Sequence, residues 1–146
     1  MDLLFRPFLL ACATKTSKVI VLALGAVQKL LAIDAASAEI LSSVIGTLRI
    51  QAESDDETVQ LKILQTLLLA IGSPSALERV EESALSQALG LCFRLHAGKS
   101  PIIANTATAT LRQVCSAHRE HPETIYKPRM SFAFNCFFEL ICLSRS

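Results

Sequence analysis

The chain has 146 residues, which is enough for one domain with a buried core. Hydrophobic residues make up 51% of it and aromatic residues only 5%, so a core must consist mainly of leucine, isoleucine, valine and alanine. Fourteen basic and thirteen acidic residues leave a net charge of +1, which is too small to favour nucleic acid or an anionic membrane as a partner. This composition favours packed helices.

The mean hydropathy of +0.45 raises the question of membrane insertion. The longest apolar run, at residues 19–27, is far shorter than the roughly twenty residues of a membrane-spanning helix, so we expect no transmembrane segment. Five cysteines, an odd number without regular spacing, argue against a disulfide framework and favour a reducing compartment. A cytoplasmic location is therefore expected.

Residues 5–31 predict two helices joined by a polar turn. In the first helix, Phe5, Phe8 and Cys12 recur at three and four residues, the spacing of one helical face. Ser17 follows the turn and is predicted to cap the second helix. That helix is apolar almost all round, so we expect it to be covered on several sides.

Two further helices are expected at residues 38–52 and 57–71. Gly46 should weaken the first of them by about 1 kcal/mol relative to alanine. The second carries two rows of apolar residues, which predicts two packing neighbours. Gly72 and Pro74 should end it, with Gly72 in a left-handed conformation and Pro74 preventing continuation.

Residues 75–82 are expected to add a turn of helix before longer helices at 83–96 and from Pro101 onward, with Gly98 ending the former. Helices that begin near residues 17, 57 and 101 are about forty residues apart, the period of armadillo and HEAT helix pairs. An ordinary helical bundle fits this spacing equally well.

Three blocks of the sequence resemble one domain family. The first block is matched by Pro7-Phe8, Ala11-Cys12, Thr14-Lys15, Lys18-Val19, Ala23-Leu24 and residues 27–30. Residues 56–69 resemble the family's central helix, and the segments 91–96 and 105–113 form the third block. The family is the DCB (dimerisation and cyclophilin-binding) domain, which begins the large Arf-GTPase exchange factors of the Golgi and their non-catalytic scaffold relative, the Mon-two family. The third block is closer to the scaffold branch.

This resemblance implies an all-α fold, an armadillo- or HEAT-like stack of antiparallel helix pairs. It also implies a non-catalytic scaffold or adaptor module that acts by protein–protein interaction in Golgi-to-endosome vesicle trafficking, peripheral at the trans-Golgi network or endosome. The expected partners are a second copy of the chain or another helical domain of a trafficking scaffold, and no cofactor is expected. Two alternatives stay open: a regulatory N-terminal module of an Arf guanine-nucleotide exchange factor, and a truncated product without independent function.

The chain is expected to divide into a DCB-like helical-repeat domain, residues 1–120, and a tail, residues 121–146, that matches nothing in the family. The family domain normally has further helices before the block at Phe5, so the domain is expected to lack its first helices. Residues 118–130 carry two prolines among charged residues, as a linker does. Residues 131–143 hold four of the seven phenylalanines and read either as a docking helix or as sequence from an alternative exon.

The sequence contains no Walker-type loop, no glycine-rich dinucleotide fingerprint and no serine elbow. Cys115, His118 and His121 are a cluster of metal-ligand residue types. Structural zinc sites normally have paired ligands at both ends, which this cluster lacks. We therefore expect neither a metal site nor enzymatic activity.

Basic side chains on or beside the matched blocks are the candidate partner-binding residues. Those of the last two helices should lie near each other if these helices are antiparallel, and those of the first turn should occupy an edge of the stack. The alternative is that they are solvent-facing residues whose aliphatic stems cover the core. The candidates are Lys15, Lys18, Arg94, His96, Lys99 and Arg112.

Overall fold

The computed structural model describes residues 2–120, and over this range the chain forms seven helices and no strand. The predicted turn of helix after Gly72 ends earlier than expected because Val80 is extended, with φ −71° and ψ 137°. The helices are α1 (Asp2–Cys12), α2 (Ser17–Ala32), α3 (Ala38–Gln51), α4 (Glu57–Ile71), α5 (Pro74–Arg79), α6 (Glu82–His96) and α7 (Pro101–Glu120).

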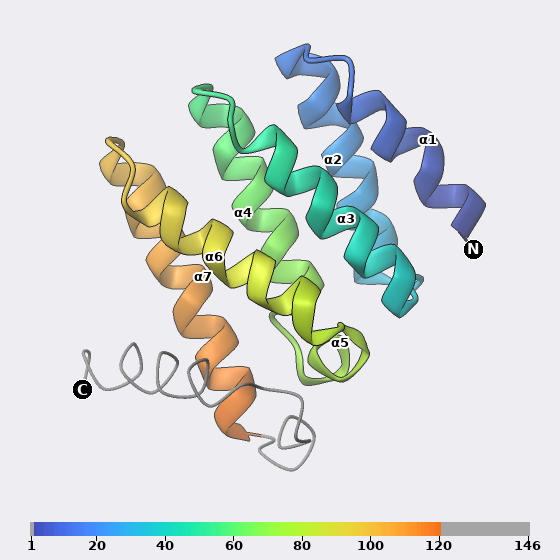
Figure 1. Ribbon diagram of the computed structural model, residues 1–146, viewed down its shortest axis with the longest axis vertical. Coiled ribbons are helices and arrows are strands. Elements are labelled where there is room, and N and C mark those ends of the chain that lie inside the picture. The colour runs from blue at the N-terminus through green and yellow to red at the C-terminus, as the bar shows by residue number, and fades with distance from the viewer. Residues whose placement is uncertain (1, 121–146) are drawn as a thin grey trace.

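The long helices form three antiparallel pairs, α1/α2, α3/α4 and α6/α7, stacked side by side in two layers (Figure 1). The first layer contains α1, α3 and α6, and the second contains α2, α4 and α7. Each helix packs against its pair partner and against its neighbours in the same layer. This arrangement confirms the predicted all-α, armadillo- or HEAT-like stack.

The core lies between the two layers and is aliphatic, as the composition predicted. Phe5 and Cys12 are 1% and 0% exposed, which confirms the predicted inner face of α1. In α4 the row through Val59, Ile63 and Leu67 is fully buried. Full burial of such a side chain contributes about 1.5–3 kcal/mol, so α4 is a main source of stability.

Two local expectations were wrong. Ser17 does not cap α2, because the capping position is Thr16, which makes no side-chain capping bond. Ser17 instead hydrogen-bonds the Asp56 carboxylate of the next pair. Gly72 is not left-handed, since its φ is −88°. A side chain there would collide with the carbonyl oxygen of Leu68, so close approach rather than dihedral angle requires the glycine.

The turn between α2 and α3 depends on Asp34, whose φ of 54° is left-handed. The amides of Asp34 and Ala35 bond the carbonyls of Leu31 and Leu30 at 3.0 and 3.3 Å, which is a Schellman ending of α2. Arg79 then fastens α5 to this turn, since its guanidinium donates to the Asp34 carboxylate at 2.8 Å and to the Ala36 carbonyl at 2.9 Å.

Candidate protein-binding surfaces

Three turns lie along one side of the stack in Figure 1, and together they form what we call the turn edge. It consists of residues 13–16, 52–56 and 97–100. Hydrogen bonds tie neighbouring turns together: Ser17 bonds Asp56, and the Ser100 hydroxyl donates to Glu57 at 3.1 Å. The bond from Ser17 is the first cause, and the Thr58 amide the second, of a lowered pKa for the Asp56 carboxyl.

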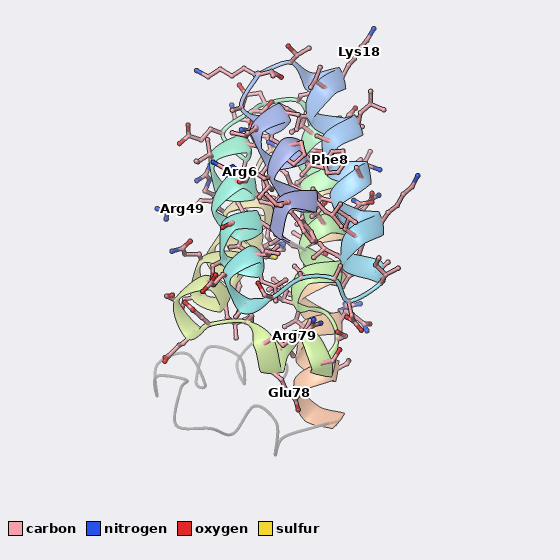
Figure 2. The ribbon with its side chains drawn as sticks, turned by 90° about the vertical axis from the view of Figure 1, so that its right-hand side faces the viewer. Arg6, Phe8, Lys18, Arg49, Glu78 and Arg79 are labelled. Carbon is pink, nitrogen blue, oxygen red and sulfur yellow. The ribbon has the colours of Figure 1, made fainter. Side chains whose placement is uncertain are left out.

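The turn edge holds two of the predicted partner-binding residues. Lys15 is exposed in the first turn, with a left-handed φ of 58°, and Lys99 is exposed in the last. Lys18 lies just inside α2 and points outward at the same end of the molecule in Figure 2. The acidic middle turn, with Glu53 and Asp55, separates the basic residues of the first turn from Lys99.

The remaining candidates lie on the last helix pair but not on one face. Arg94 is exposed on α6 in the first layer, and Arg112 is exposed on α7 in the second. His96 packs against α7, because its Nδ1 lies 3.3 Å from the Ala104 carbonyl and 3.0 Å from the Thr108 hydroxyl. The six candidates are therefore divided between the two ends of the stack.

Sequence reasoning missed an apolar surface on α1. Leu3, Leu4 and Leu10 are 78%, 51% and 64% exposed, although Phe5 between them is buried. The sequence contains a signal for this surface, because Leu3 and Leu10 are seven residues apart and lie on the helix face opposite Phe5 and Cys12. An amphipathic helix packed on one side only would carry polar residues there.

A groove runs beside this surface, between α1 and α3, with a volume of about 420 Å³. Figure 2 shows Arg6 on the side of α1 that faces α3, and Phe8 on the side that faces α2. The groove is apolar in its floor and charged on both rims. Its lining is Phe5, Arg6, Leu9, Leu10, Glu39, Ile40, Ser43 and Thr47.

The described residues offer little chemistry. Burial raises the pKa of the Cys92 thiol to about 12 and also raises that of Cys12, so neither is a ready nucleophile. Among the side chains that are described, no group of histidine, cysteine and carboxylate residues is placed to hold a metal ion. The Cys115, His118 and His121 cluster lies outside those side chains. Within residues 2–120, no helix has the length and apolar character to cross a bilayer.

A stack of helix pairs with an exposed apolar end helix and a groove beside it is typical of helical-repeat modules that bind other proteins. The chain belongs to the DCB family: the family model "Mon2/Sec7/BIG1-like, dimerisation and cyclophilin-binding domain" matches residues 1–118. This confirms the resemblance drawn from the three sequence blocks.

Relatives include the human "Protein MON2 homolog", 40% identical over 109 residues, and its Drosophila melanogaster counterpart, 35% identical over 113. Each alignment covers 75% of this chain. The rat "Brefeldin A-inhibited guanine nucleotide-exchange protein 1" is 31% identical over 126 residues, which cover 77% of the chain. The chain spans only 6–7% of the length of these relatives. No solved structure matches the chain.

Proposed function

We propose that the chain is a non-catalytic scaffold or adaptor module that binds a second copy of itself, or another helical domain, through α1. The observation that carries this proposal is the exposure of Leu3, Leu4 and Leu10 beside the groove between α1 and α3. Complete burial of one leucine contributes about 1.5–3 kcal/mol. The gain from all three would offset part of the cost of association, about 4–15 kcal/mol.

The membership in a dimerisation family supports self-association as the first form of this binding. In a symmetric dimer the same patch lies on both subunits, and α1 meets this condition because its leucines can interdigitate with their copies. The rims also complement each other, since Arg6 and Glu39 lie on opposite sides of the groove and a two-fold axis would bring unlike charges together.

We further propose that this binding serves vesicle trafficking between the Golgi and endosomes, peripherally at the trans-Golgi network. The similarity to MON2 homologs of several animals supports a scaffold in this role. The 31% identity to a brefeldin A-inhibited exchange protein supports a second candidate, a regulatory module that accompanies an exchange domain in a longer protein. In both cases residues 1–120 are proposed as the functional unit.

Light scattering coupled to size-exclusion chromatography tests self-association. We expect a dimer for the whole chain and a monomer for the double variant Leu3→Gln with Leu10→Gln. A matched control replaces Ile50 and Ile102, which are 67% and 56% exposed elsewhere in the stack, with glutamine. A wild-type chain that is monomeric at about 50 µM, well above the typical dissociation constants of stable dimers, would refute self-association. A control that also dissociates would move the interface away from α1.

A further inference from the structure

The second layer of the stack, α2, α4 and α7, is charged almost entirely by basic residues. Its helices contain two carboxylates, Glu57 at the first residue of α4 and Glu120 at the last of α7. Glu57 is engaged by Ser100 at the turn edge. Between these ends lie Lys18, Lys29, Lys62 and Arg112, which with the exposed side chains around them form what we call the basic face.

These four cations have no anionic partner among the described side chains. Among the described side chains, Arg79 and Asp34 form an ion pair, and it lies on a different part of the molecule. Lys62 is half-buried, and its Cε lies 3.9 Å from the point where a side chain on Gly25 would begin, so its stem covers α2. A cation that lies over apolar side chains without a carboxylate partner is stabilised when a carboxylate of another molecule binds it.

The basic face also exposes aliphatic side chains. Leu22 on α2, Leu69 on α4 and Ile102 on α7 are 75%, 40% and 56% exposed. The seam between α2 and α4 is fixed, because Gln28 donates to the Thr66 hydroxyl at 3.1 Å and to the Lys62 carbonyl at 3.4 Å. A rigid surface of aliphatic side chains bordered by cations is complementary to an amphipathic helix that carries apolar anchors and carboxylates.

Other anionic partners fit this face less well. Proteins that bind single-stranded nucleic acid stack its bases on aromatic residues, and α2, α4 and α7 contain none. Anionic membranes are bound by about four to eight lysines and arginines clustered in one segment, whereas the four cations of this face are spread over three helices. A second copy bound symmetrically over this face would oppose lysine to lysine.

We propose that the basic face binds an acidic amphipathic helix of a partner protein, lying along the seam between α2 and α4. The contacts would be carboxylates on Lys29 and Lys62 and apolar anchors on Leu22 and Leu69. This site is separate from the α1 surface, so the chain can associate through α1 and hold a helix here at the same time.

The test uses the whole chain and a fluorescent designed peptide of about 18 residues, long enough to form a helix on a surface. The peptide has leucines on one face and glutamates on the other, and a second peptide has lysine in place of every glutamate. Fluorescence anisotropy should show binding of the glutamate peptide only, weakened at least about tenfold by Lys29→Glu with Lys62→Glu. The control, Arg49→Glu on α3 of the first layer, should stay within about twofold of wild type.

Circular dichroism checks that each variant keeps its helix content, and Lys62→Gln repeats the test with less disturbance of a half-buried side chain. Equal binding of both peptides, or unchanged affinity in the Lys29 and Lys62 variants, would overturn the proposal. So would sedimentation of the chain with phosphatidylserine vesicles that is lost in these variants while the peptide fails to bind. The oligomeric state should not change in any of them, which separates this proposal from association through α1.

Discussion

Single polar residues join parts of the chain that are far apart in sequence. Ser17 reaches Asp56, Ser100 reaches Glu57, and Arg79 reaches the turn at Asp34. Local spacing in the sequence could not have assigned a partner to any of these residues. One buried polar group has no hydrogen-bond partner among the described residues.

That group is the Ser42 hydroxyl on α3, which is buried and makes no hydrogen bond with any described residue. A buried hydroxyl without a partner costs about 1–3 kcal/mol. We therefore expect Ser42→Ala to raise the free energy of unfolding by about 1 kcal/mol in urea titrations. The control is Ser43→Ala, since Ser43 is exposed, and it should change little. A less stable Ser42→Ala protein would show that the hydroxyl has a bound water or another partner.

Cys92 gives a pH-dependent prediction. Its thiol has a pKa raised by burial to about 12, against an ordinary value of 9.0, so the unfolded chain loses this proton first. The contribution of the buried thiol to the free energy of unfolding is complete below pH 9 and declines as the pH rises toward 12. Urea titrations between pH 8 and about 10 should show a smaller decline for Cys92→Ala than for the wild type. Rapid reaction of Cys92 with a thiol reagent at pH 8 in the folded chain would contradict this.

At the scale of helices, the sequence predicted the elements well where a single face is buried. Phe5 and Cys12, and the row from Val59 to Leu67, repeat at helical spacing and lie inside. The failures have two physical causes, which are contact between helix pairs for Ser17 and close approach within α4 for Gly72. The partner of Ser17 lies on another helix pair, and the need for glycine at position 72 comes from the nearby Leu68 carbonyl rather than from its own dihedral angles.

The glycines offer a test at this scale. A side chain at Gly46 in α3 or at Gly90 in α6 would meet no atom within 4 Å, whereas one at Gly72 would meet the Leu68 carbonyl. Alanine at either of the first two positions should raise stability by about 0.5–1 kcal/mol, because it lowers the entropy of the unfolded chain. Gly72→Ala should lower stability by about 1–3 kcal/mol. Equal effects at all three positions in thermal melts would contradict the packing around Gly72.

At the scale of the whole molecule, the candidate site was only partly predictable. Basic residues were identified from the matched blocks, but the layer to which each belongs follows from the packing of helix pairs. Arg94 and Arg112 lie on adjoining helices yet in different layers. The exposed leucines of α1 were missed because periodicity identifies the buried face and does not show what covers the other.

Arg94 and Arg112 remain candidates for partner binding through the last helix pair. The double variant Arg94→Glu with Arg112→Glu should abolish capture of a partner helical domain in a pull-down. Helix content should be unchanged, because both side chains are exposed. Arg49→Glu on α3, which belongs to none of the proposed binding surfaces, is the control. Unchanged capture would remove both residues from the site.

The position of α4 has a consequence for how the chain loses its structure. This helix contacts α2, α3, α5, α6 and α7, so it packs against at least one helix of every pair in the stack. Solenoids usually melt one repeat at a time from an end, since each repeat contacts only its neighbours. Among the described helices there is one inner pair, and when α4 separates, α2 and α7 both lose their neighbour in the second layer, so these helices should melt together.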